Sequence, residues 1–442
     1  MILISRVRPD LYSSKLLLTT FKYLMGITLL MQSCTPIVQS SGNSGSNPKV
    51  LSLSDKAYES GIRTILLYPK GAPLLPAVTQ LGQWNLMLEF DELKNQYETY
   101  YARIEYCNYD WTPSSLQHLD YMTAYNEFPI NNYEYSVDTH ISYVHYWLQL
   151  PAVKLSGNYV VVVYRGSDKE DIILSRRFMV FDPKITFNDR ENLIGPGTLA
   201  SINQQLNFTI KYSGMNILNP QLDVHTSIRQ NQRWDNYAVD VRPSFVREMD
   251  KELDYRFFDE AYMFKGGNEF RFFDLRSLNY PGRNVANINK TVKPFEAFIQ
   301  TDKSRRGQTY AQYNDLDGGF RLDNYDYKNI VYSNYVTVNF ALDSPPIKGD
   351  VYVNGAFNYW ALGSENKMRY DTARSKYVAK VLLKQGWYDY QYYVKSSTLP
   401  PTYFDGSHFE TENYYEIFVY YRPFQPQADL LVGYLQLARN AR

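Results

Sequence analysis

Four consecutive valines, Val160 to Val163, limit most strongly what this chain can fold into. Successive side chains of a strand point to opposite faces, so a strand that is apolar at every position must be covered on both faces. Such burial is typical of a central strand in a β-sandwich. Tyr is abundant, with 42 copies in 442 residues, and aromatic residues reach 16%. Because aromatic residues favour strands and no long run has a 3.6-residue apolar period, we predict an almost entirely β protein.

Two breaks that contain proline divide the chain into units of domain size. They lie at Asp182–Pro183 and at Ser344–Pro346. Within the first unit, residues 86–91 are predicted as a strand, and Asp91 is predicted to start the turn that follows it. The spacing of turn signals along the chain is typical of sandwiches. We therefore predict three consecutive immunoglobulin-like β-sandwich domains, at residues 50–182, 184–343 and 347–422, followed by a C-terminal tail or strand at 423–442.

The N-terminus has the pattern of an export signal. Four basic residues precede an apolar stretch from Tyr23 to Met31, which is too short to cross a bilayer permanently. The stretch leads into Ser33-Cys34, an arrangement that resembles a bacterial lipoprotein signal. We predict residues 1–33 as a signal peptide and Cys34 as the lipidation site; a plain secretory signal cut nearby is the alternative. Residues 34–49 are predicted as a flexible tether.

Composition argues against several classes of function. The chain carries 46 basic and 46 acidic residues, so it lacks the basic footprint of a nucleic-acid-binding protein. With Cys34 assigned to a lipid, Cys107 has no partner for a disulfide. A thiol nucleophile near His118 is conceivable, but the surroundings favour Cys107 as a small buried hydrophobe.

Metal and cofactor sites are not expected. His140 and His145 are five residues apart in an alternating segment, which places them on opposite faces of a regular strand. Asp315 and Asp317 precede Gly318 and could suggest calcium, but the spaced set of oxygen ligands is missing, so a hairpin tip is favoured. No catalytic residues, metal ligands or cofactor can be nominated, and we predict that the protein is not an enzyme.

Four motifs occur in order between residues 107 and 159. They are CNYDWTPS at Cys107–Ser114, INNY at Ile130–Tyr133, YVHY at Tyr143–Tyr146 and SGNY at Ser156–Tyr159. The series resembles the N-terminal domain of the plug protein family of the Bacteroidetes type IX secretion system, which has C-x-x-D-W-x-P-S, I-x-x-Y, Y-x-H-Y and S-G-N-Y in this order.

The resemblance implies a periplasmic plug that is not an enzyme. Its partner would be the outer-membrane translocon barrel, whose periplasmic opening it would close. The segment after Cys34 lacks the acidic residues that resemble a surface-export tag, so we expect anchoring to the inner leaflet of the outer membrane. Candidate partner contacts are Asp110, Trp111 and Tyr133, in the loops at 108–116 and 126–133. For Asp110-Trp111 a structural corner is the alternative, because Asp can form an Asx-turn and Trp a buried anchor.

The predicted third domain suggests an alternative function. Gly355-x-Phe357-Asn358-x-Trp360 and the later tyrosine strand resemble the early-set immunoglobulin-like module of glycogen-binding domains. In such modules exposed Trp rings stack on sugars, so Trp360 and Trp387 are candidates for sugar stacking. The alternative is therefore a lipid-anchored carbohydrate-binding protein. An exposed aromatic strip would favour this alternative, and burial of both rings would contradict it.

Overall fold

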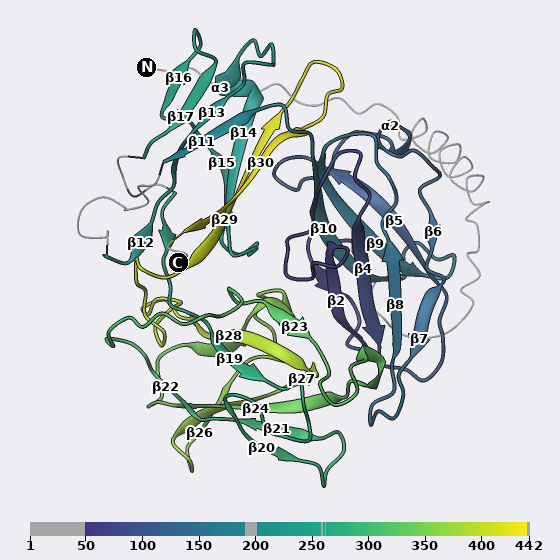
Figure 1. Ribbon diagram of the computed structural model, residues 1–442, viewed down its shortest axis with the longest axis vertical. Helices are drawn as coiled ribbons and strands as arrows, with labels where there is room; N and C mark the ends of the chain where they lie inside the picture. The colour runs from purple at the N-terminus through teal and green to yellow at the C-terminus, as the bar shows by residue number, and fades with distance from the viewer. Residues whose placement is uncertain (1–48, 191–200, 258–259, 261, 440–442) are drawn as a thin grey trace, which may run out of the picture. The chain divides into compact units, whose positions relative to one another are not determined.

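The computed structural model describes residues 49–190, 201–257, 260 and 262–439, and Figure 1 shows its strands. The described helices are single turns, at α2 (His118–Tyr121), α3 (Pro220–Asp223), η2 (Ile330–Tyr332) and η3 (Ala356–Asn358). The sheets are mainly antiparallel, and the all-β sandwich prediction is confirmed. Among the described residues, no helix is long and apolar enough to cross a membrane. Cys34 and the predicted signal peptide lie outside the described residues.

The first sandwich packs a sheet with the order β1-β10-β9-β5-β6, in which β3 also pairs with β10, onto a sheet with the order β2-β4-β8-β7. Its strands are β1 (Lys56–Ala57), β2 (Ile62–Pro69), β3 (Val78–Gln80), β4 (Leu86–Glu92), β5 (Tyr100–Cys107), β6 (Phe128–Pro129), β7 (Asn132–Tyr135), β8 (Val144–Gln149), β9 (Gly157–Arg165) and β10 (Ile172–Phe181). Asp91 is buried within β4, so the predicted turn at this residue is wrong: a charge partner from another sandwich makes its burial possible.

The valine run forms the middle of β9, and each face of it enters a different core. Val161 and Val163 pack inside the first sandwich, with side chains such as Phe90 of the facing sheet. Val160 and Val162 pack outward into a second cluster that contains Phe418 of the middle sandwich. The two-sided burial predicted from the sequence therefore has two separate causes.

The middle sandwich contains sheets with the orders β11-β13-β17-β16 and β15-β14-β29-β30, and a short pair β12-β18. Its strands are β11 (Thr186–Arg190), β12 (Asn203–Gln204), β13 (Asn207–Lys211), β14 (Val224–Gln230), β15 (Tyr237–Val241), β16 (Phe245–Arg247), β17 (Glu252–Tyr255), β18 (Phe264–Lys265), β29 (Asn413–Tyr421) and β30 (Leu430–Arg439). In Figure 1 the yellow strand β29 lies beside the teal strand β14, and β30 lies on the other side of β29.

The third sandwich contains the sheets β19-β28-β23, with β25 also paired to β28, and β20-β21-β24-β27-β26, with β22 also paired to β24. Its strands are β19 (Arg271–Asp274), β20 (Val285–Asn289), β21 (Glu296–Ile299), β22 (Asp302–Lys303), β23 (Phe320–Leu322), β24 (Tyr335–Asp343), β25 (Asp350–Asn354), β26 (Arg369–Asp371), β27 (Lys376–Lys384) and β28 (Gly386–Lys395).

Strand pairing runs across the boundary that we predicted at 344–346. Strand β24 lies before this break and β27 after it, yet they pair from Tyr335↔Lys384 to Asp343↔Lys376. The predicted tail also pairs backwards, because β30 lies on β29 in the middle sandwich. Proline and turn signals mark where a strand ends, but they do not specify which strand it pairs with. The third sandwich is thus inserted between β18 and β29.

Candidate functional site

The first motif forms a closed corner after β5. The Asp110 Oδ1 atom accepts hydrogen bonds from Thr112 N at 3.0 Å and from Thr112 Oγ1 at 2.6 Å, which is an Asx-turn. Asn108 N donates to Thr112 O, and Cys107 forms an isolated bridge with Pro113. Asp110 itself is exposed. The motif therefore sets the direction in which the chain leaves the sheet.

Trp111 lies under this corner. Its side chain is only 6% exposed, and its ring meets Trp234 of the middle sandwich edge-to-face at 4.9 Å. The Arg177 guanidinium lies 4.4 Å from the centre of the Trp111 ring. Burial conflicts with the prediction that Trp111 is a direct partner contact, because its ring is already used within the chain. Burial of this kind is what the alternative of a structural corner predicts for Trp111.

Cys107 is fully buried beside the same corner. Burial raises the pKa of its thiol to about 12, so the thiol stays protonated at neutral pH. A thiol in this state is a poor nucleophile.

The SGNY motif lies at the same end of the sheet, where Asn158 of β9 pairs with Cys107 of β5. The Tyr106 hydroxyl donates to Ser156 O at 3.0 Å and to Asp429 O at 2.8 Å. Asn158 Nδ2 donates to Asn108 O at 3.0 Å, and Asn158 Oδ1 accepts from the Tyr420 hydroxyl at 2.9 Å. The two motifs are thus joined to each other and to the C-terminal part of the chain.

Asp429, which precedes β30, completes these contacts. Its carboxylate accepts from Tyr109 N at 2.9 Å and from Arg422 Nε and Nη2, each at 2.7 Å. Tyr109 also stacks on His225 of β14 with ring centres 4.0 Å apart. We call the contacts of residues 107–114 and 156–159 with the middle sandwich the motif seam. Its chemistry is that of an internal joint, with aromatic packing and buried hydrogen bonds.

A second joint connects the first sandwich to the third. Asp91 Oδ2 accepts from Lys384 Nζ of β27 at 2.7 Å and from the Tyr335 hydroxyl of β24 at 2.7 Å. His145 Nδ1 lies 2.8 Å from Asp91 Oδ1. Burial alone would raise the pKa of Asp91, but Lys384 and His145 hold it at about 2. We call this cluster the charged seam.

Neither histidine of the YVHY region lies in a metal-binding cluster. His145 belongs to the charged seam, and the His140 ring meets Phe295 at 4.1 Å. In the part of the chain that the structure describes, no group of three or more His, Cys, Asp or Glu side chains is arranged to hold a metal ion.

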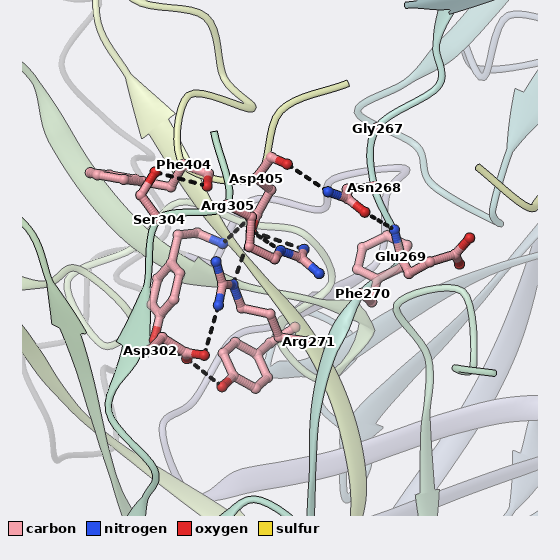
Figure 2. A network of polar contacts seen from close by, with 12 residues as sticks. Gly267, Asn268, Glu269, Phe270, Arg271, Asp302, Ser304, Arg305, Phe404 and Asp405 are labelled. Atoms are coloured by element: carbon pink, nitrogen blue, oxygen red, sulfur yellow. Dashed lines mark hydrogen bonds and ion pairs between the residues drawn. The ribbon is translucent and has the colours of Figure 1, made fainter. Parts of the chain in front are cut away.

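Figure 2 shows a polar network inside the third sandwich. Arg271 on β19 donates from Nε to Asp405 Oδ1 at 2.9 Å and from Nη1 to Asp302 Oδ1 at 2.7 Å. Arg305 Nη2 also reaches Asp405 Oδ1 at 2.9 Å. Burial raises the pKa of Asp405, but the two guanidinium groups outweigh it and lower the pKa. Since both carboxylates are paired, we assign this network to the stability of the sandwich.

Trp360 and Trp387 do not form an exposed strip. Trp360 is 7% exposed, and the Arg233 guanidinium lies 4.2 Å from its ring centre. Trp387 is half-buried and stacks on Phe272 at 4.5 Å with an interplanar angle of 12°. The exposed strip on which the carbohydrate-binding alternative depended is therefore not observed at these two residues.

Tyr133 lies on an exposed edge. It belongs to β7, the terminal strand of its sheet, and all four residues of β7 are exposed. Tyr133 stacks on Tyr97 at 4.6 Å and meets Tyr135 edge-to-face at 5.7 Å. These three side chains are 38–47% exposed, and we call them the tyrosine patch. The sequence analysis missed Tyr97 and Tyr135; the alternation Tyr133-Glu134-Tyr135 is the signal that could have indicated the second of them.

Comparison with known proteins agrees with the motifs. Residues 62–182 match the model of the family described as "Type 9 secretion system plug protein 1st domain". Over this segment the chain is similar to the type 9 secretion system plug family. The family resemblance predicted from the four motifs is confirmed, and all four lie within the matched segment. The segment runs from the start of β2 to just beyond the end of β10, so the plug domain is the core of the first sandwich.

A solved structure is similar over a longer stretch. The crystal structure of a hypothetical protein from Parabacteroides merdae is 28% identical to this chain, with a TM-score of 0.81. The alignment covers 88% of this chain and 100% of that chain, so the likeness extends well beyond the plug domain. No curated protein matches the chain.

Proposed function

We propose that this protein closes the periplasmic opening of a type IX secretion translocon barrel in the outer membrane. The observation that carries the proposal is the match of residues 62–182 to the plug family. A wide barrel left open would leak solutes, so a stopper has a physical purpose. Its action depends on shape and surface complementarity and needs no catalysis.

The internal joints of the chain support this role. A stopper has to resist deformation when it fills a pore. The motif seam and the charged seam connect the first sandwich to the other two through buried hydrogen bonds and an ion pair. Buried hydrogen-bonded networks of this kind favour one arrangement of their partners.

We propose the tyrosine patch and Asp110 as the partner contacts of the first sandwich. Tyr provides contact area and a hydrogen bond at low entropic cost, which suits an interface that must form and separate. The patch lies at an open sheet edge, and such edges bind other chains readily.

Changing Tyr133 to arginine is expected to reduce recovery of the barrel about tenfold, because a bulky charge would replace an aromatic contact. The measurement is a pulldown with the full chain from detergent-solubilised outer membranes, followed by mass spectrometry. Tyr280→Arg is the matched control, since Tyr280 is 78% exposed in the third sandwich. Asp110→Asn, which keeps the Asx-turn oxygen, tests the second contact.

Two results would count against these proposals. If Tyr133→Arg and the unaltered chain recover the barrel equally, the tyrosine patch is not the contact. If the unaltered chain recovers no large barrel, the plug function itself is rejected.

We further propose that a lipid on Cys34 anchors the protein to the inner leaflet of the outer membrane. A flexible tether at 34–49 would then keep a released plug near the pore at high effective concentration. Cys34→Ala is expected to leave the melting temperature unchanged but to slow reclosure. The measurement is solute leakage through the translocon after a burst of secretion. Leakage as brief as in the unaltered strain would contradict the tether.

A further inference from the structure

A cavity of about 400 Å³ lies where the three sandwiches meet. Leu67 of the first sandwich, Tyr414 of the middle one and Trp360 of the third contribute to its walls. This volume is in the range of small-molecule sites, which commonly form at domain interfaces. The cavity is separate from the tyrosine patch, so what it binds is independent of the proposed plug function.

Asp317 is the unusual side chain of this cavity. It lines the wall, and within the described part of the chain its carboxylate has no hydrogen bond or ion pair. Its backbone is left-handed, with φ at 52°, and its N–H donates to Asp315 Oδ1 at 2.8 Å. Left-handed residues other than glycine are uncommon, and they cluster at functional sites.

The charges that act on Asp317 are negative. They belong to Glu412, Asp389 and Glu269, while Asp315 on the same turn also lines the cavity. Burial and these carboxylates raise the pKa of Asp317 to about 8. Burial, followed by Asp389 and Asp317, raises the pKa of Asp315 to about 9. A positive charge at this wall would relieve the repulsion and allow both carboxyls to ionise.

Aromatic rings form another part of the wall. Tyr359 and Trp360 line the cavity, and each already has a guanidinium group over its ring, from Arg176 at 5.0 Å and Arg233 at 4.2 Å. Tyr414 is close enough to Asp317 for its own pKa to be raised, chiefly by burial and then by that carboxylate. Carboxylates beside aromatic rings are a chemical environment that favours organic cations.

We propose that this cavity binds an organic cation, a primary ammonium or a guanidinium group, with its charge on Asp317. Asp315 provides the second carboxylate, and the apolar stem of the ligand packs on the aromatic wall. The cation is either a free small amine or the Lys or Arg side chain of a partner, and the experiment separates these sources.

The test is isothermal titration calorimetry of the full chain with butylamine, agmatine and, as a neutral counterpart, butanol. Both cations are expected to bind and butanol is not. Asp317→Asn should weaken binding about tenfold or more. Asp138→Asn is the matched control, because Asp138 is exposed, left-handed with φ at 53°, and absent from the cavity wall. No binding of either cation, or equal binding to Asp317→Asn, would overturn the proposal.

Proton release gives a second readout. The acidic groups and the phenol that face the site are Asp315, Asp389, Glu269, Glu412 and Tyr414. The cavity is also lined by the Arg176–Asp55 ion pair, and Arg233 lies over the Trp360 ring. At pH 7 the cation must displace protons from carboxyls of raised pKa, so binding should release protons, up to about two when both carboxyls ionise, and should tighten between pH 6 and pH 9. Repeating the titration in buffers of different ionisation enthalpy measures the release. Binding without proton release and without pH dependence would place the cation elsewhere.

Acetylated tripeptide amides Gly-Lys-Gly and Gly-Arg-Gly distinguish the two sources. Binding of either peptide that Asp317→Asn weakens assigns the site to a partner side chain. Binding of the free amines alone assigns it to a small molecule. Neither the amine titrations nor the peptide titrations use the translocon, so their results do not depend on the outcome of the pulldown.

Discussion

Replacing Lys384 by methionine is expected to lower the free energy of unfolding by about 3–5 kcal/mol, because the change leaves Asp91 charged and buried without its cation. Lys384 is 0% exposed and Asp91 1% exposed, and their Nζ and Oδ2 atoms lie 2.7 Å apart. In the variant the Tyr335 hydroxyl still donates to Asp91 and His145 Nδ1 still lies 2.8 Å from its other oxygen, but neither group replaces the ammonium group of Lys384. The measurement is the shift of the unfolding midpoint in urea and in calorimetry.

A matched control lies on the same strand. Lys380 Nζ is 2.6 Å from Glu296 Oε1, but Lys380 is 63% exposed. Lys380→Met should therefore change the stability by less than about 1 kcal/mol. The double variant Asp91→Asn/Lys384→Met should recover much of the loss, since it leaves no unpaired charge. If Lys384→Met behaved like Lys380→Met, the charged seam would not contribute to stability as argued.

Replacing Gly157 by alanine is expected to lower the free energy of unfolding by about 3 kcal/mol or more. The backbone at Gly157 has φ at 148°, which an L side chain rarely adopts. A Cβ there would lie 2.3 Å from the Tyr106 hydroxyl oxygen, a clash that requires movement of the buried Tyr106. The Tyr106 hydroxyl donates hydrogen bonds to the backbone oxygens of Ser156 and Asp429, so movement of Tyr106 would disturb the motif seam. A drop in melting temperature measures the effect.

Gly166→Ala separates the two causes of this cost. Gly166 also has positive φ, at 54°, but a Cβ there meets nothing within 4 Å. Its substitution should cost about 1 kcal/mol, from the backbone alone. Equal costs at the two positions would mean that the contact with Tyr106 has no energetic role.

These two expectations give the family motifs a structural meaning in this chain. Gly157 gives Tyr106 the space it needs, and Asn158 accepts from Tyr420. Trp111 fills the space beside Trp234. The residues that identify the plug domain thus also build its joint with the middle sandwich, whereas the tyrosine patch and Asp110 remain candidates for the external partner.

The fold class, the resemblance to the plug family and the central strand could all be predicted from local patterns in the sequence. Alternation along a strand is a local property, so the two-sided burial of Val160 to Val163 could be predicted from four adjacent residues. The order of the four motifs between Cys107 and Tyr159 was enough to predict the resemblance to the plug family. Tyr133 was also singled out, although nothing in the sequence indicated that Tyr97 stacks on it.

Which distant segments pack together could not be predicted in this way. Val160 and Val162 share a core cluster with Phe418, and Asp91 is paired with Lys384, which is 293 residues away along the chain. In the sequence, an acidic residue at the end of a strand predicts a turn. The buried partner of Asp91, Lys384, cannot be identified from the residues near Asp91. Local patterns specify which face of a strand is buried, but the partner depends on chain topology and on the fit of distant side chains. For the same reason, the sequence did not predict that β30 belongs to the middle sandwich. Nor did it predict the cavity beside Asp317.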